Sequence, residues 1–127
     1  MSISLPHDHG HSDVEELLAR LWSDSDFKSL SELFSLLGDS TRLRLFWILC
    51  HSEECVINLS AIMDMSSPAI SHHLKLLKSA ELIVSRREGK EVYYRAADSD
   101  RARLLHDTVE HLASLTCPNG TCRFKEQ

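Results

Sequence analysis

The sequence predicts a mainly α-helical domain with a small β-hairpin, arranged as a winged helix-turn-helix. Apolar residues recur at 3–4 spacing along most of the chain, which is the period of an amphipathic helix. A short apolar helix is followed by Ser66-Ser67-Pro68 and a second amphipathic stretch, and two β-prone runs then flank Gly89. In this order, the elements make a helix-turn-helix followed by a hairpin, or wing.

Length and composition allow one domain. The 127 residues are 43% apolar and 26% charged, which excludes a disordered chain. We expect a mobile His-rich arm over residues 1–12, the winged domain with its dimerisation helices over residues 13–116, and a Cys-containing tail over residues 117–127. The longest apolar run, residues 45–50, is far shorter than the roughly 20 residues that cross a bilayer, and no signal pattern opens the chain. The sequence therefore predicts a cytoplasmic protein whose cysteines are thiols or metal ligands.

Three helices are expected before the helix-turn-helix. Their apolar positions share one face over residues 14–21, 30–37 and 41–51. Gly38 ends the second helix, and Ser40 or Asp39 caps the third. Side chains expected to have structural roles only are Trp22, Trp47 and Cys50 in the core, His51 at a helix end and His106 on the surface.

The helix-turn-helix itself is expected over residues 56–80. Its first helix covers residues 56–64, and Ser66-Ser67-Pro68 opens the second, because proline fits the first turn of a helix, where no amide partner is needed. The apolar side chains that face inward from this second helix are Ile70, Leu74 and Leu77.

A last helix over about residues 100–115 follows the hairpin of residues 82–95. Its apolar side chains form a continuous seam along one face. We expect the N- and C-terminal helices to mediate dimerisation, because such a seam must be covered.

The middle of the chain carries the expected DNA-binding surface. The net charge of -5 divides into -6 for residues 1–40, +2 for residues 41–95 and -1 for residues 96–127. A helix in the major groove brings small polar side chains near its N-terminus to base edges, while hairpin cations contact phosphates. The expected contacts are Ser66, Ser67, Ala69, Ser71, His72 and Lys75 from the helix, and Arg86, Arg87 and Lys90 from the hairpin. Taken separately, the same residues also fit a helix cap and a solvated turn.

Three stretches carry a resemblance to a known family. They are LLGDSTRLRLFWIL, SSPAISHHLKLLKSAELI and SRREGKEVYYRAAD, over residues 36–49, 66–83 and 85–98. In this order and spacing the chain resembles the ArsR/SmtB winged-helix repressors that sense metals. The resemblance implies a homodimer that represses transcription by binding operator DNA and dissociates on binding a divalent ion, Zn²⁺ first, with Cd²⁺, Ni²⁺ and Co²⁺ as alternatives. Ser67 stands where members often carry a base-reading Gln, so the operator is not inherited from relatives.

The last helix offers a candidate metal site. Asp98 and Asp100 lie at its start, and His111 lies eleven residues beyond Asp100. At about 1.5 Å per residue these ends are roughly 16 Å apart, whereas metal–ligand bonds are only about 2.0–2.2 Å. One chain cannot close this site, but two antiparallel helices in a dimer would form it twice. Alternatively, the carboxylates are helix caps and His111 is a surface residue.

The resemblance adds residues to this site and implies a second one. In the first site it implies Asp98, Asp100, His111 and Ser114, although Asp100 replaces a common His and Ser114 replaces a usual carboxylate. In the second it implies a thiolate, Cys55, used with N-terminal ligands. The histidines of the arm available for this are His7, His9 and His11. Alternatively, the histidines belong to a solvated tail and Cys55 is a packed side chain without a ligand.

Cys117 and Cys122 are a third candidate site, because paired thiolates take soft ions, arsenite-like species or oxidants. Alternatively, they are two thiols of the tail without a binding role. Two rival functions therefore remain beside the metal-responsive repressor. One is a thiol-based repressor that senses arsenite, persulfide or redox state, and the other is a metal-buffering protein without specific DNA binding. An enzyme is excluded because no nucleophile motif, His-Glu-x-x-His helix or phosphate-binding glycine loop is present. The expected partners are double-stranded operator DNA and a second copy of the chain, with no membrane.

Overall fold

The computed structural model describes residues 5–7 and 13–117, which fall into two compact units, Met1–Phe34 and Ser35–Gln127. In the first unit, α1 (Val14–Arg20) is capped by Asp13, whose Oδ1 accepts the Glu16 N–H at 3.1 Å. Most of α2 (Asp24–Leu37) follows. The first helix matches the predicted residues 14–21 within one residue, whereas α2 ends as predicted but begins six residues before the predicted residue 30.

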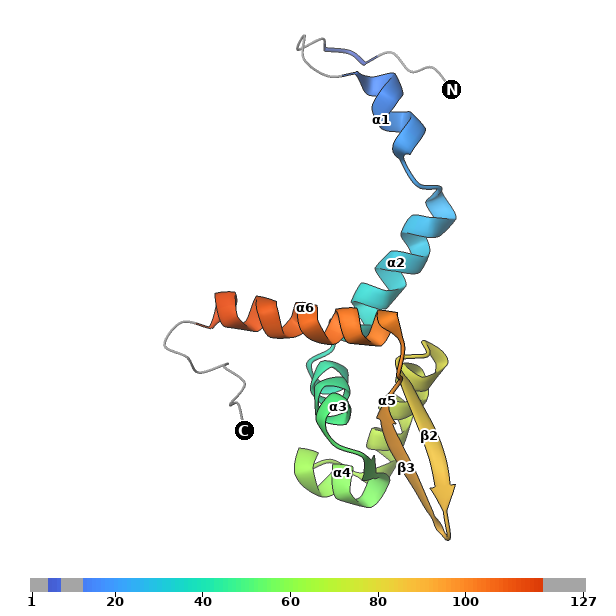
Figure 1. Ribbon diagram of the computed structural model, residues 1–127, viewed down its shortest axis with the longest axis vertical. Helices are drawn as coiled ribbons and strands as arrows, with labels where there is room; N and C mark the ends of the chain where they lie inside the picture. Colours follow the sequence, from blue (N-terminus) through green and yellow to red (C-terminus); the bar gives the residue numbers. More distant parts are fainter. Residues whose placement is uncertain (1–4, 8–12, 118–127) are drawn as a thin grey trace. The chain divides into compact units, whose positions relative to one another are not determined.

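The second unit contains the winged helix-turn-helix. Figure 1 shows its elements, which are α3 (Ser40–His51), β1 (Glu54–Cys55), α4 (Val56–Met63), α5 (Ser67–Ser79), β2 (Ile83–Glu88), β3 (Glu91–Ala96) and α6 (Asp100–Thr116). The helix-turn-helix, the hairpin and the last helix are confirmed within one or two residues of their predicted bounds. No described helix is long and apolar enough to cross a bilayer.

Short polar side chains set the helix boundaries. Asp39 rather than Ser40 caps α3, since its Oδ1 accepts the Arg42 N–H at 3.1 Å, and this hydrogen bond lowers the pKa of Asp39. Ser66 caps α5 by accepting the Ala69 N–H at 3.3 Å. At α6 the cap is Ser99. The alternative that Asp98 and Asp100 cap α6 is therefore wrong.

The sheet has three antiparallel strands in the order β1-β3-β2. The hairpin pairs Glu88 with Glu91 across a two-residue turn, and Gly89 takes φ +62°, which glycine adopts without strain. The third strand was not predicted. It consists of Glu54 and Cys55 only, which pair with β3, and two residues are too few to show strand alternation.

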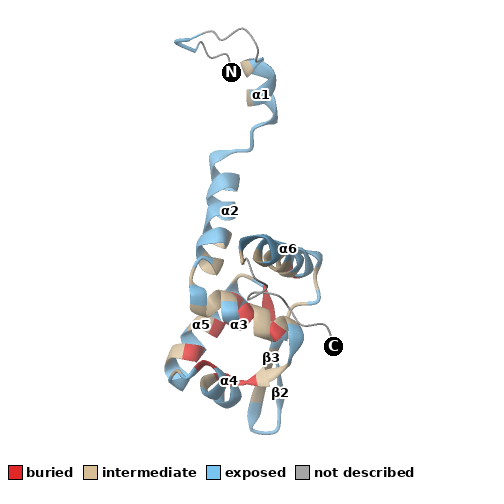
Figure 2. Ribbon diagram, turned by 90° about the vertical axis from the view of Figure 1, so that its left-hand side faces the viewer, coloured by how far each residue is buried: buried red, intermediate tan, exposed pale blue. Residues whose placement is uncertain are grey.

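The core lies where α3, α5 and the sheet meet, as the buried segments in Figure 2 show. Its largest fully buried side chains are Phe46, Leu45, Leu59, Ile70, Leu74, Leu77, Leu82 and Ile83. The three α5 positions predicted to face inward are all among them. This packing fixes the opposite face of α5 toward solvent.

Several apolar side chains are not covered. On α6, Leu104 is 68% exposed, Leu112 57% and Leu115 73%. In the first unit, Trp22 is 59% exposed and contacts Phe27 with ring centroids 5.5 Å apart. The prediction of Trp22 as a core residue is wrong for a single chain, because the described residues leave most of its surface open. Cys50 is likewise only half-buried.

Candidate nucleic-acid interface and metal centre

The exposed face of α5 holds the residues predicted to read DNA. Ser66, Ser67, Ser71, His72 and Lys75 are exposed, whereas Ala69 is half-buried. A hydrogen bond of 3.1 Å between the hydroxyls of Ser60 and Ser67 joins α4 to the start of α5. At the other end, Lys78 Nζ donates to Ser85 Oγ at 2.7 Å and joins α5 to β2. The helix and the wing are therefore held as one surface.

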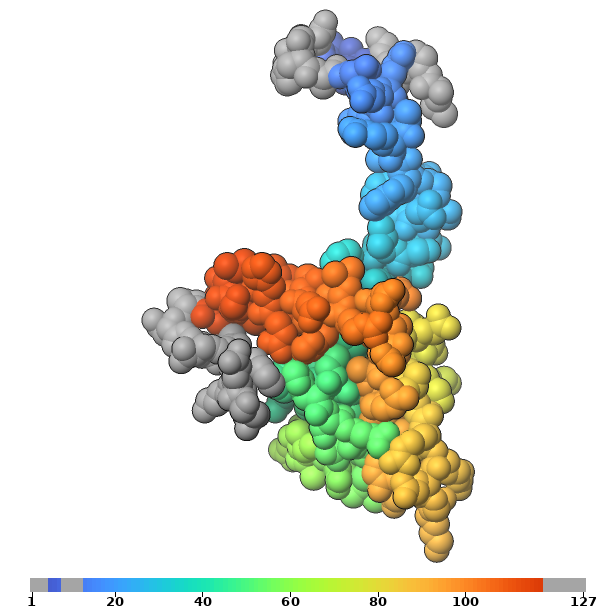
Figure 3. Space-filling model, in the orientation of Figure 1, coloured from blue at the N-terminus to red at the C-terminus, as the bar shows by residue number. Residues whose placement is uncertain are grey.

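The wing carries two arginines in different settings. Arg86 donates to Glu53 and Glu88 and lies 4.9 Å above the Tyr93 ring, and these hydrogen bonds raise the pKa of Arg86 and lower that of Glu53. Arg87 Nε donates only weakly to Gly89 O, at 3.3 Å, and its side chain is exposed. Figure 3 shows the hairpin projecting from the second unit. Arg87 is thus better placed than Arg86 to contact phosphate.

The start of α6 brings two predicted metal ligands together. Asp98 Oδ1 and Asp100 Oδ1 both pair with the guanidinium of Arg103, the latter at 2.7 Å. The hydrogen bond to Asp100 raises the pKa of Arg103. The two carboxylates are highly exposed and point to one cation, so a divalent ion would have to displace Arg103.

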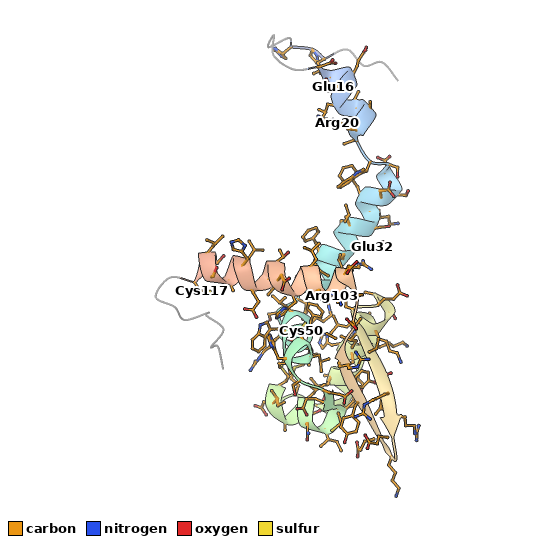
Figure 4. The ribbon with its side chains drawn as sticks, viewed as in Figure 1. Glu16, Arg20, Glu32, Cys50, Arg103 and Cys117 are labelled. Atoms are coloured by element: carbon orange, nitrogen blue, oxygen red, sulfur yellow. The ribbon has the colours of Figure 1, made fainter. Side chains whose placement is uncertain are left out.

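The other two predicted ligands lie near the far end of α6. His111 is exposed, and Ser114 Oγ donates to His111 O at 2.7 Å. Figure 4 shows Arg103 near the start of the helix and Cys117 at its end. A single α6 therefore does not bring His111 to the aspartates, as its length of 17 residues requires.

The remaining candidates are only partly described. Cys55 is 7% exposed and pairs with Tyr93 in the sheet. His7 belongs to the first unit, while His9 and His11 lie outside the described residues. Cys117 follows α6 and takes part in a disulfide, and Cys122 lies outside the described residues.

The structure also groups three residues that sequence reasoning missed. His51 at the end of α3 lies beside His106 and Glu110 of α6, with 2.9 Å between the two Nε2 atoms. Glu110 Oε1 lies 3.1 Å from His106 Nε2 and 3.4 Å from His51 Nε2. The available signal was the spacing of His106 and Glu110, which puts both on one helix face.

A pocket of about 420 Å³ opens beside this cluster. Cys50, His51, His106 and Asp107 are among its lining residues. Burial, together with the nearby Glu110 charge, raises the pKa of Cys50 to about 11. The ligand-type atoms that converge within 4.8 Å of one another here are the nitrogens of His51 and His106 and an oxygen of Glu110.

Comparison with known sequences identifies the family. The model of the arsR family of bacterial regulatory proteins matches residues 39–85. A transcriptional repressor SmtB homolog from Synechocystis sp. is 37% identical over 99 residues, which are 78% of this chain and 75% of the relative. An arsenical resistance operon repressor from Staphylococcus aureus is 30% identical over 78% of this chain and 91% of its own length.

Solved structures agree with this assignment. A homodimeric winged helix-turn-helix DNA-binding domain from Mycobacterium bovis has a TM-score of 0.63 and 26% identity, and the match covers 86% of this chain and 93% of that one. The regulator HlyU from Vibrio vulnificus has a TM-score of 0.59 and 26% identity over 74% of this chain and 94% of its own. The chain belongs to the ArsR family of winged helix-turn-helix transcriptional repressors, which are DNA-binding regulators and not enzymes.

Proposed function

We propose that this chain is a homodimeric repressor that binds operator DNA in the cytoplasm and releases it when a divalent metal ion, Zn²⁺ first, binds between the two α6 helices. The observation that carries this proposal is the layout of α6. Two carboxylates stand at its start and His111 near its end, while Leu104 between them and Leu112 and Leu115 beyond His111 are uncovered. Relatives named as SmtB and cadmium resistance regulators support a metal as the effector.

The donor set of α6 fits zinc. Asp98 and Asp100 already hold one cation, Arg103, and the imidazole of His111 is exposed. Carboxylate oxygen and imidazole nitrogen are zinc ligands in proteins. Ser114 contributes little, because a neutral hydroxyl is a weak ligand, and its Oγ donates to the His111 carbonyl on its own helix. In an antiparallel pair, the aspartates of one copy and His111 of the second copy would hold the ion.

Release of DNA requires that the ion bind better to the DNA-free shape of the dimer than to the DNA-bound shape. Typical coupling free energies of about 1–3 kcal/mol weaken DNA binding about 5–150-fold. Linkage is reciprocal, so operator DNA must weaken zinc binding by the same factor. A metal-buffering protein would show no such coupling and no preference for an operator.

The replacement His111→Ala tests the proposal. We expect operator affinity without metal to stay within about twofold of the parent, because His111 lies on α6 and not on the α5–wing surface. Zinc should no longer release the DNA, since the ion loses its imidazole ligand from the second copy. Fluorescence anisotropy of labelled operator DNA, titrated with protein at fixed Zn²⁺, measures both quantities. Zinc-driven release that persists in His111→Ala would move the regulatory site away from this pair of helix ends.

The replacement Arg87→Ala tests the wing. Losing one phosphate contact per chain should weaken binding to operator and unrelated DNA alike, and should reduce the slope of log K against log salt by about one per chain. Arg20→Ala, an exposed arginine of α1, is the matched control and should leave the slope unchanged. An unchanged slope in Arg87→Ala would remove this residue from the phosphate contacts.

One observation favours the thiol-based alternative, namely the disulfide at Cys117. Replacing Cys117 and Cys122 together by serine separates the two functions. The metal-responsive repressor should still release DNA with zinc, whereas a thiol-based repressor should remain bound under arsenite and oxidants. Release by zinc that disappears in this double variant would favour the thiol alternative.

A further inference from the structure

Three ligand-type atoms from two helices converge within a single chain. His51 Nε2, His106 Nε2 and Glu110 Oε1 form a triangle with sides of 2.9, 3.1 and 3.4 Å. Their side chains are only about a quarter exposed, so the cluster is partly shielded from solvent. None of these residues belongs to the set of Asp98, Asp100 and His111, although Asp98 lines the pocket beside the cluster.

The triangle has the size that a metal ion requires. A tetrahedral ion with bonds of about 2.0–2.1 Å holds its ligand atoms about 3.3 Å apart. The circle through the three atoms, computed from their separations, has a radius of about 1.8 Å. An ion slightly above the plane of the triangle therefore reaches all three atoms at normal bond lengths with little movement.

The surroundings orient these groups as supporting residues do around metal ligands. Trp47 Nε1 donates to Glu110 Oε1 at 2.9 Å, which holds the carboxylate. The other ring nitrogen of His106, Nδ1, faces Asp107 Oδ1 at 3.5 Å. A small movement of the 80% exposed Asp107 side chain would make this the hydrogen bond from carboxylate to non-ligating histidine nitrogen that is usual at zinc sites.

The facing nitrogens of His51 and His106 and the Glu110 oxygen beside them share polar contacts that a divalent ion can replace. The 2.9 Å contact between His51 and His106 accommodates one shared hydrogen. A divalent ion satisfies both nitrogens and the Glu110 oxygen at once. The pocket beside the cluster leaves room for a water molecule or another small ligand in a fourth position.

We propose that His51, His106 and Glu110 form an intrachain site for a divalent transition metal ion with borderline character, such as Zn²⁺ or Co²⁺. The two nitrogens and one oxygen select such ions over Mg²⁺ or Ca²⁺, which take oxygen ligands, and over soft ions, which take thiolates. An ion here ties the middle of α6 to the end of α3. Because α3 leads through β1 into α4, metal binding here is coupled to the helix-turn-helix within one chain.

The test is Zn²⁺ binding to the full-length protein, by competition with a chromophoric chelator, in parent and variant chains. His106→Gln and Glu110→Gln should each lose one equivalent of Zn²⁺ per chain, or weaken it by more than the roughly 10–100-fold typical of losing a supporting residue. Asp107→Asn, a supporting residue, should weaken the same equivalent about 10-fold. His72→Gln, an exposed histidine of α5, is the matched control and should bind as the parent does.

A second measurement needs no change in the ligands. In a Trp22→Phe background Trp47 is the only tryptophan, and its emission should respond to the same equivalent of Zn²⁺, because its indole donates to Glu110. Co²⁺ should give the visible spectrum of nitrogen and oxygen ligands, without a thiolate charge-transfer band. The proposed site would be overturned if folded His106→Gln and Glu110→Gln bound Zn²⁺ with the stoichiometry and affinity of the parent. It would also be overturned if Zn²⁺ left the emission of Trp47 unchanged.

The outcome is independent of the proposed release mechanism. His111→Ala should keep this equivalent of Zn²⁺ while losing the release of DNA, and a monomeric variant should keep it as well. Failure of metal-driven release is read from operator binding, whereas failure of this site is read from metal stoichiometry and Trp47 emission.

Discussion

Replacing Leu112 and Leu115 together by lysine is expected to convert the protein to a monomer and to lower its operator affinity roughly 10³-fold, toward the level of non-specific binding. Both side chains lie on the uncovered face of α6, 57% and 73% exposed in the single chain. Burying a leucine stabilises by about 1.5–3 kcal/mol, and each replacement acts twice in a symmetric dimer. Because neither side chain is buried in the single chain, the monomer should stay folded.

Analytical ultracentrifugation gives the oligomeric state, and fluorescence anisotropy gives operator affinity. Ile57→Lys is the matched control, because Ile57 is also exposed, at 65%, but lies on α4. It should leave the dimer intact. A double variant that remains dimeric with parental operator affinity would show that α6 does not hold the two copies together, and the metal site between two α6 helices would be lost with it.

The elements with strong local signals could be predicted from the sequence. Pro68 after two serines marks the start of α5, Gly89 marks the wing turn, and the spacing of Ile70, Leu74 and Leu77 gives the buried face. Strand β1 could not be predicted, because its two residues become a strand only by pairing with β3.

The candidate sites show the same division. The residues of α5 and the wing follow from the motif, because neighbours in sequence share that surface. The cluster of His51, His106 and Glu110 depends on a contact across 55 residues, which no local pattern encodes. Trp22 shows a second limit of prediction from sequence. The apolar character of a side chain favours its burial but does not say whether the same chain or a partner buries it.

Phe46→Ala is expected to lower the free energy of unfolding by about 3–5 kcal/mol, the range for removing a fully buried phenylalanine. Phe46 is 1% exposed and stands in the core where α3 packs against α5, so its loss leaves a cavity behind α5. The total free energy of unfolding of a domain is about 5–15 kcal/mol, so this one replacement removes a large share of the stability. Thermal unfolding followed by circular dichroism should show a midpoint lower by more than about 10 °C.

The matched control is Phe34→Ala, because Phe34 is 72% exposed in the single chain. Both replacements are best measured in the monomeric Leu112→Lys/Leu115→Lys background, where unfolding does not depend on association. There Phe34→Ala should cost no more than about 0.5 kcal/mol, as surface substitutions do. Since α5 is positioned by this core, Phe46→Ala in the dimeric parent should also lose operator binding at a lower temperature than Phe34→Ala does. Equal unfolding midpoints for the two variants would contradict the placement of the core between α3 and α5.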